Sequence, residues 1–303
     1  MSKELPIAPS EPAHPDARTD LKGWAEYAKE KIDGRPVIVS VSGGKDSLAV
    51  GLLLKSAGIP FEAIHMATGW EAPSHAGYLA YLETILGPIR ILKSPLGGFA
   101  DLVRKYRMFP SGRMRFCTRI LKLEPMQKYL KSLQLEGLDP LNAIGVRAGE
   151  SRARSKLGEW EWQPKFDCDV WRPILRWEEA DVIALHHEHG AKPNPLYTAG
   201  ARRVGCYPCV FVSKEDIRRL AESDPERIEE LAALERESWA LATAHYEALG
   251  KPVPAHWKTF FENPRHAKSV AESVTWSKTA HGGKQFEMFS APNDGCLSWG
   301  LCS

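Results

Sequence analysis

Residues 36–54 read PVIVSVSGGKDSLAVGLLL, an apolar run, a glycine turn and a second apolar run. The first run carries no charge and is rich in β-branched residues, which is typical of a buried parallel strand. The second run is long enough for a helix and ends at KSAG, residues 55–58. A strand, a glycine turn and a helix in this order open a doubly wound domain. We therefore expect an α/β fold with a mostly parallel sheet.

The same alternation continues along the chain. The hydrophobic patterns predict strands at 61–68, 89–92 and 142–147, and helices at 21–31, 74–86, 121–135, 178–189 and within 214–249. Residues 1–20 contain four prolines and no hydrophobic period, so we expect a flexible leader. We expect the α/β domain over residues 21–212. Residues 213–303 are expected to form a smaller region, with a helical arm and a cysteine-containing tail.

The composition excludes several classes of protein. With 43% hydrophobic residues, 26% charged residues and a formal net charge of +2, the 303-residue chain is neither disordered throughout nor uniformly basic. No apolar run approaches the roughly 18 residues of a spanning helix, and the start lacks a secretory signal. We therefore expect a cytoplasmic protein with no membrane partner. Six cysteines are too few for a disulfide scaffold in a chain of this size.

The glycine turn favours an anion. Its six residues are Ser42, Gly43, Gly44, Lys45, Asp46 and Ser47. The glycines allow the backbone to approach phosphate oxygens, the serines add hydroxyl donors, and Lys45 adds a positive charge at a helix N-terminus. The other interpretation is a tight turn in which Asp46 or Ser47 caps the helix. The Walker A pattern is absent, so this is another kind of nucleotide loop.

The motif SGGKDS resembles the signature of PP-loop ATP pyrophosphatases, which cleave ATP between the α and β phosphates. Further segments, in order, narrow the resemblance to the phosphoadenosine phosphosulfate (PAPS) reductase-like branch: TGWE at 68–71, GVR at 145–147 with ES at 150–151 and Arg154, WRP at 171–173, Trp177 with DV at 181–182, NPLY at 194–197 and GCYPC at 205–209. The resemblance runs from about residue 36 to 212. It implies an adenine nucleotide α-hydrolase-like fold.

This resemblance also implies roles for individual residues. Thr68 and Gly69 end a predicted strand and would line the adenosine pocket, as the carboxyl edge of a parallel sheet does. Arg147 ends the strand predicted at 142–147 and would bind phosphate or sulfate oxygens. Lys45, Asp46 and Arg147 are the implied catalytic residues, with ATP and Mg²⁺ as cofactors. The other interpretations are a strand-end turn at Thr68 and a solvated basic loop at Arg147.

Three cysteines form the first part of a candidate metal site. Cys206 and Cys209 lie on one tight loop, where neighbouring arginines are expected to lower their pKa values. By itself this pair fits a redox site or half a zinc site. The segment around Cys117 is similar to that of iron–sulfur assimilatory reductases, although Thr118 replaces the second of two adjacent cysteines. The resemblance implies a four-iron four-sulfur cluster on Cys117, Cys206 and Cys209. Zinc and no metal remain the alternatives.

The other three cysteines have separate expectations. We take Cys296 as the fourth cluster ligand and Cys302 as a mobile catalytic nucleophile. Their roles can be exchanged, or one iron can stay open to hold a sulfide. Cys168 lies in an apolar and acidic stretch, so we expect a buried core thiol. Three histidines within 186–189 lie on a predicted helix, and we interpret them as a solvated face rather than a metal site.

A basic stretch from Arg104 to Arg119 precedes and surrounds Cys117. It fits an anionic substrate, either a sulfonucleotide or a nucleic-acid backbone, or else a solvated charged face. The intact loop favours ATP chemistry over PAPS reduction. The sequence therefore predicts adenylation of a substrate followed by sulfur transfer. Similar systems are the PP-loop component of DNA phosphorothioation and the cluster-bearing tRNA thiolases.

The expected partners follow from this function. They are a DNA or tRNA acceptor and a sulfur donor such as a cysteine desulfurase. One alternative is a reductase of PAPS or adenosine phosphosulfate (APS), whose C-terminal cysteine attacks the sulfonate and which thioredoxin regenerates. Another is a nucleotide-sensing or iron–sulfur assembly subunit without turnover.

Overall fold

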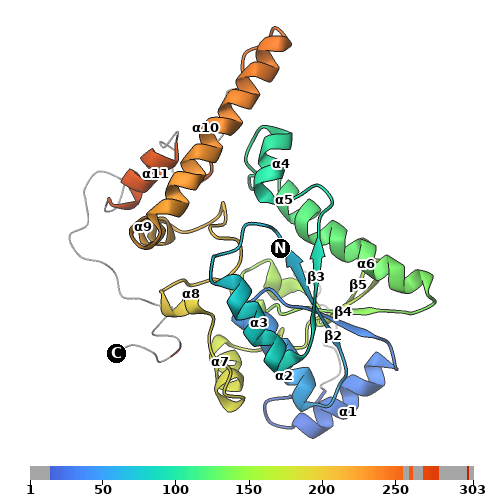
Figure 1. Cartoon of the computed structure of the whole chain (residues 1–303). Coiled ribbons are helices and arrows are strands. Elements are labelled where there is room, and N and C mark those ends of the chain that lie inside the picture. Colours follow the sequence, from blue (N-terminus) through green and yellow to red (C-terminus); the bar gives the residue numbers. More distant parts are fainter. Residues whose placement is uncertain (1–13, 255–258, 262–268, 280–298, 300–303) are drawn as a thin grey trace, which may run out of the picture.

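The computed structural model describes residues 14–254, 259–261, 269–279 and Trp299 (Figure 1). Its six-stranded sheet has the order β3-β2-β1-β4-β6-β5. The strands are β1 (Val37–Ser40), β2 (Glu62–Ala67), β3 (Ile89–Lys93), β4 (Leu141–Ala143), β5 (Trp160–Gln163) and β6 (Cys168–Trp171). Every neighbouring pair is parallel except β5 with β6. The expected α/β fold with a mostly parallel sheet is confirmed.

Helices connect and cover these strands. They are α1 (Leu21–Ile32), α2 (Lys45–Ser56), α3 (His75–Leu86), α4 (Phe99–Tyr106), α5 (Phe116–Thr118), the π-helical η1 (Arg119–Leu123), α6 (Glu124–Leu135), α7 (Glu179–Glu188), α8 (Pro195–Thr198), α9 (Lys214–Ser223), α10 (Pro225–Ala248) and α11 (Val270–Ser277), with short 3₁₀ turns η2 (Ala148–Glu150) and η3 (Arg154–Lys156). Within the described residues, no helix combines the length and apolar character needed to cross a membrane.

Strand β1 is buried on both faces. Val37 and Val39 belong to the core beneath α1, α2 and α7. Ile38 points to the opposite face, where it joins a smaller core with Met126 and Leu130 of α6. This arrangement explains why the strand is an unbroken apolar run rather than an alternating one. It also fixes the carboxyl end of β1, from which the glycine turn of residues 42–47, called the phosphate loop below, extends.

A second core lies beside the sheet. It joins α4, α5 and η1 to the C-terminal helices α9 and α10 through apolar side chains such as Phe99, Phe116, Ile217 and Leu231. Figure 1 shows α9, α10 and α11 together, with α10 extending away from the sheet. The charged stretch 214–249 forms two helices, because Asp224 caps α10 through the Arg227 N–H (3.0 Å) and a proline follows it.

The strand predicted at 142–147 is shorter than expected. β4 ends at Ala143, because the chain then passes directly over the first turn of α2. A Cβ atom on Gly145 would lie 2.5 Å from the carbonyl of Asp46. Glycine therefore allows this close approach. Arg147 consequently does not end a strand, as the sequence had predicted, but lies in the loop beside α2.

The described part of the predicted leader contacts the domain. His14 Nε2 lies 2.8 Å from Glu159, and its ring stacks on Tyr27 with centroids 4.5 Å apart. Arg18 pairs with Asp181 of α7 at 2.8 Å. Residues 14–20 are thus attached to the α/β domain, whereas residues 1–13 lie outside the described part of the chain.

Candidate functional site

The phosphate loop closes onto the first turn of α2. The Ser47 hydroxyl donates to the Gly44 carbonyl (2.9 Å) and accepts from the Ser42 backbone N–H (3.1 Å). Gly44 is the N-cap residue, and it has no side chain with which to cap the helix. The first backbone N–H groups of α2 are therefore left for other acceptors. A helix N-terminus of this kind favours a phosphate through both its N–H groups and its dipole.

Two side chains hold Gly43 in place. Asn194 Nδ2 donates to the Gly43 carbonyl (3.1 Å). The backbone of Gly43 has a φ of +78°. A Cβ atom here would lie only 2.9 Å from Cε1 of His75. Both the backbone angle and the His75 ring therefore require glycine at this position.

The backbone of Lys45 is supported from α7 and α8. Its N–H donates to the Tyr197 hydroxyl (3.2 Å), and its carbonyl accepts from His186 Nε2 (2.9 Å). A carbonyl only accepts, so His186 carries a proton on Nε2. Trp299 packs against the rings of His186 and Tyr197, with centroids 5.1 and 5.7 Å away. A residue from the end of the chain thus stabilises the side chains that hold the loop.

A group of four charged side chains lies beside the first turn of α2: Lys45, Asp46, Arg147 and Glu179. Arg147 Nε donates to the Asp46 carboxylate. Lys45 Nζ lies 3.3 Å from Glu179, and Arg147 Nη2 lies 3.9 Å from the same carboxylate. The Lys45 side chain is 7% exposed and that of Glu179 is 47% exposed. Two buried cations are therefore neutralised in part by a surface carboxylate that an anionic ligand can displace.

Changing Glu179 to glutamine is expected to tighten the binding of pyrophosphate about fivefold. The substitution keeps the size of the side chain but removes an ion pair, and a half-exposed pair contributes about 1 kcal/mol. Titration calorimetry with pyrophosphate in EDTA measures the dissociation constant without a contribution from Mg²⁺. Glu178→Gln is the matched control, because Glu178 is an exposed neighbour with no ion pair among the described residues. Unchanged or weaker binding in Glu179→Gln would contradict displacement.

The end of β2 carries an ionised carboxylate. The N–H and hydroxyl of Thr68 both donate to Glu71 Oε1, at 2.6 and 2.7 Å. Burial alone would raise the pKa of Glu71, but these hydrogen bonds lower it below its ordinary value. Gly69 lies against the backbone of Gly98. Thr68 and Gly69 thus lie just beyond the carboxyl end of β2, where a parallel sheet binds its ligands.

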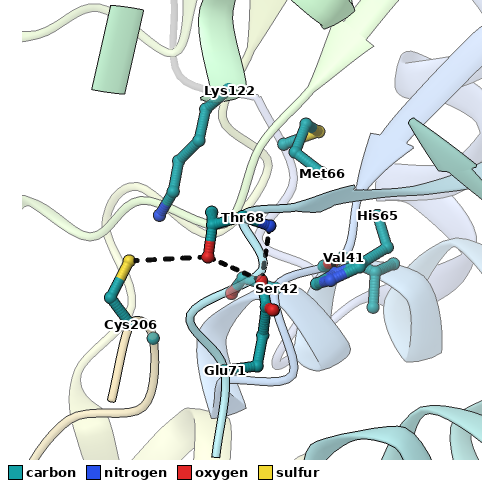
Figure 2. A pocket seen from close by; sticks show the side chains of 9 residues that line it. Val41, Ser42, His65, Met66, Thr68, Glu71, Lys122 and Cys206 are labelled. Atoms are coloured by element: carbon teal, nitrogen blue, oxygen red, sulfur yellow. Dashed lines mark hydrogen bonds between the residues drawn. The ribbon is translucent and has the colours of Figure 1, made fainter. Parts of the chain in front are cut away.

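A pocket joins the phosphate loop, the end of β2 and the loop at 205–209, with about 400 Å³ of empty space that is partly open to solvent. Its walls are Val41, Ser42, His65, Met66, Thr68, Glu71, Lys122, Gly205 and Cys206. The Thr68 hydroxyl and the Cys206 sulfur are 4.0 Å apart. Figure 2 shows the ammonium group of Lys122 on the same side as the Cys206 thiol. A ligand here would meet a cation, an ionised carboxylate, two hydroxyl groups and a thiol.

Two histidines link this pocket to the loop. His65 Nδ1 donates to the Val41 carbonyl (2.8 Å), so its Nε2 accepts from His75 Nε2–H (3.2 Å). Burial lowers the pKa of both rings, which are therefore neutral at pH 7. His75 also lies against Gly43. The two histidines therefore support the loop at two residues, Val41 through His65 and Gly43 through His75.

Three of the four predicted metal ligands lie near one another. Cys117, Cys206 and Cys209 are partly buried and pack against the second core. Burial raises the pKa of Cys117, and so do the nearby sulfurs of Cys206 and Cys209. Among the residues that the structure describes, no group of three His, Cys, Asp or Glu side chains is arranged to hold a metal ion. Cys296 and Cys302 lie outside the described residues.

The expected lowering of the thiol pKa values is wrong for Cys206. Burial raises the pKa of Cys206, and the cation that opposes this rise is Lys122 rather than an arginine. Arg202 and Arg203 are instead exposed. The expectation for Cys168 is confirmed, since this side chain is fully buried and burial raises its pKa to about 11.

The solvated face predicted for residues 186–189 is wrong for its first histidine. His186 follows Val182 and Ile183 at helical spacing and shares their buried face. Burial lowers its pKa to about 4. His187 and His189 are exposed, as predicted.

Several side chains that complete the site had no predicted role. They are His65, Glu71, His75, Lys122, Glu179, His186, Asn194 and Tyr197. The NPLY segment does contain a signal for Asn194 and Tyr197, because it matches a motif of the resembled family. Glu179 had no such signal, since it is one of two glutamates at the start of a helix.

Comparison with known proteins gives a family match. Residues 36–211 match the model for the phosphoadenosine phosphosulfate reductase domain. This range is more than half of the 303-residue chain. It contains the phosphate loop, Arg147 and the three clustered cysteines.

Individual relatives extend this match. An uncharacterised 37.8 kDa protein of Escherichia phage 186 is 32% identical, over 85% of this chain and 92% of its own length. An adenosine 5′-phosphosulfate reductase of Streptomyces coelicolor is 27% identical, over 59% of this chain and 71% of its own. A solved structure, PAPS reductase from Candida auris in a phosphate complex, has 18% identity and a TM-score of 0.48, covering 60% of this chain and 87% of that one.

Proposed function

Because the chain belongs to the phosphoadenosine phosphosulfate reductase domain family, we propose that it is a PP-loop enzyme that adenylates an acceptor and supports sulfur transfer. The observation that carries this proposal is the pair of buried cations at the phosphate loop. Lys45 and Arg147 are both 7% exposed. Buried cations are costly unless they are paired, and here Arg147 pairs with Asp46 while both cations lie near the half-exposed Glu179. A pyrophosphate group would take the place of Glu179 as their shared partner.

The residues of the loop would act on ATP as follows. The backbone N–H groups of Asp46 and Ser47 and the Lys45 ammonium group would bind the β and γ phosphates, since the Lys45 N–H already donates to the Tyr197 hydroxyl. A nucleophilic oxygen of the acceptor attacks the α-phosphorus, and the bond to the bridging oxygen breaks. Pyrophosphate leaves with that electron pair, and Arg147 balances the growing negative charge. A sulfur nucleophile then displaces AMP from the acceptor.

The loop fits a magnesium ion. Mg²⁺ is usually held by one or two carboxylates together with substrate phosphates. Asp46 has one carboxylate oxygen that its hydrogen bond with Arg147 does not use. When bound, the ion would neutralise charge on the leaving pyrophosphate. Asp46 is the residue that would hold it.

Cys117 of α5 and the two cysteines of the 205–209 loop match an iron–sulfur cluster in ligand type, although the described side chains are not arranged to hold a metal ion. Cys117, Cys206 and Cys209 offer three thiols in apolar surroundings, and such clusters are held by cysteine thiolates. Cys296 is the proposed fourth ligand and Cys302 the proposed nucleophile. With Cys296 as the fourth ligand the cluster has no open iron, so Cys302 would deliver the sulfur; if Cys296 did not bind, the open iron would hold it. A cysteine desulfurase is the proposed sulfur donor, and DNA or tRNA is the proposed acceptor.

A sulfonucleotide reductase is the second candidate. The 27% identity to an adenosine 5′-phosphosulfate reductase favours it. In that reaction, a C-terminal cysteine attacks the sulfur of PAPS or APS, the nucleotide leaves, and thioredoxin releases sulfite. The complete SGGKDS loop argues against it, since a reductase has no β,γ-pyrophosphate leaving group to bind.

Incubation of anaerobically purified protein with ATP labelled at the α-phosphate tests the proposal. Labelled AMP and pyrophosphate are expected from the wild type, and Lys45→Ala should lose both. Sulfite release from PAPS or APS without ATP use would replace the proposal with the reductase. ATP binding without either product would indicate a nucleotide sensor.

A separate measurement tests the cluster. The purified protein is expected to absorb at about 400 nm, and colourless zinc-loaded protein would contradict the cluster.

A further inference from the structure

The segments that carry the three clustered cysteines also form an exposed basic and aromatic surface. We define the Arg115–Phe211 surface by five residues: Arg113, Met114, Arg115, Arg119 and Phe211. The Arg115 guanidinium lies over the Phe211 ring, 4.8 Å from its centroid. Phe211 is 45% exposed and Met114 is 43% exposed. An aromatic ring in contact with arginine is thus presented to solvent rather than packed into the core.

The charge around this contact is mainly positive, although Arg119 pairs with Glu124 at 3.6 Å. Residues 102–123 contain seven lysines and arginines and no acidic residue. Residues 199–214 contain three more, again without an acidic residue. Arg113 makes no ion pair with any other residue that the structure describes. These two stretches meet where Arg115 contacts Phe211, so basic charge from distant parts of the sequence is concentrated at one place.

We propose that the Arg115–Phe211 surface binds unpaired nucleotides of a single-stranded nucleic acid. The arginines match a phosphate backbone, and the exposed Phe211 ring offers a face on which a base can stack. Bases expose their flat faces only where they are unpaired, so a duplex would use the charge alone. An acidic peptide would likewise leave the aromatic ring unused.

The surface is next to the candidate site. Arg115 precedes Cys117 by two residues, and Phe211 follows Cys209 by two. Cys206, on the same loop, lines the pocket that contains Thr68 and Lys122. A nucleotide stacked on Phe211 would therefore lie beside the cysteines. Binding of a single strand to this surface does not depend on the proposed function. The conclusion that the strand is the acceptor does, because it rests on the proposed sulfur transfer.

Fluorescence anisotropy with labelled 20-nucleotide DNA and RNA strands, without ATP, tests the surface. Phe211→Ala is expected to weaken binding about tenfold, as the loss of one stacked base would. Phe211→Tyr should retain it. The double variant Arg113→Ala, Arg115→Ala should reduce the slope of log affinity against log salt by about 1.4, or about 0.7 for each phosphate contact. The tighter strand identifies DNA or RNA as the ligand.

The controls remove equivalent groups elsewhere. Trp162→Ala removes an aromatic ring that is 54% exposed on edge strand β5, and Lys128→Ala with Lys131→Ala removes two exposed charges from α6. Both should bind strands as the wild type does. Strands that fail to bind, a duplex that binds equally well, or Phe211→Ala behaving as Trp162→Ala would each overturn the proposal. The α-labelled ATP assay is separate, so strand binding without AMP formation would refute only the proposed function.

Discussion

Replacing Arg147 with alanine is expected to lower the free energy of unfolding by about 3 kcal/mol. The guanidinium is nearly buried and pairs with Asp46 and Glu179. Its removal leaves the Asp46 carboxylate without this partner in a region of low dielectric. The expected loss is at the lower end for a broken buried pair, because Asp46 is 17% exposed and keeps some contact with water. Urea unfolding followed by circular dichroism measures the change.

Two further variants separate this effect from the loss of any arginine. Arg152→Ala removes an exposed arginine from the same loop and should change stability by less than about 0.5 kcal/mol. Asp46→Asn combined with Arg147→Ala should recover most of the loss, because no uncompensated carboxylate remains. If Arg147→Ala and Arg152→Ala unfold at the same urea concentration, the buried pair does not stabilise the protein.

Changing Gly43 to alanine is expected to weaken ATP binding about 100-fold. A side chain at positive φ costs about 1–2 kcal/mol, and the new Cβ would lie 2.9 Å from His75. The ring or the loop must move, and a total of about 3 kcal/mol corresponds to two orders of magnitude in affinity. The backbone N–H groups would then no longer converge on one phosphate. Titration calorimetry with ATP gives the dissociation constant.

The chain contains a matched control for the cost of placing a side chain at positive φ. Gly34 has a φ of +72°, and nothing lies within 4 Å of its added Cβ. Gly34→Ala should therefore lose some stability but bind ATP as the wild type does. Adding His75→Ala to Gly43→Ala should restore part of the affinity, since it removes the steric conflict. Equal dissociation constants for Gly43→Ala and Gly34→Ala would show that the loop does not bind the nucleotide.

The sheet could be predicted where the pattern is local. The apolar run at 36–41 and the glycine turn specify β1 and the start of α2, because both depend on neighbouring residues alone. The end of β4 could not be predicted in this way. It depends on the passage of Gly145 over Asp46, which are close in space but about a hundred positions apart.

The same distinction applies to the site. The loop and Thr68 belong to short motifs with recognisable residue types. The role of His186 depends on its hydrogen bond to the Lys45 carbonyl, and that of Glu179 depends on its distances to two cations. Contacts of this kind form only when the chain folds, so the local hydrophobic pattern of the sequence does not predict them. The raised pKa of Cys206 has the same origin, because burial outweighs the opposing charge of Lys122, which is distant in the sequence.

The packing of Trp299 has a consequence for the order in which the protein is made. A ribosome extends the chain from its N-terminus, and early segments begin to fold first. Gly43 would leave the ribosome long before Asn194 and Tyr197, and Trp299 follows every other described residue. Since Trp299 supports His186 and Tyr197, a nascent chain carries a phosphate loop that lacks part of its wall. The wall around this loop is therefore complete only after Trp299 has been added to the chain.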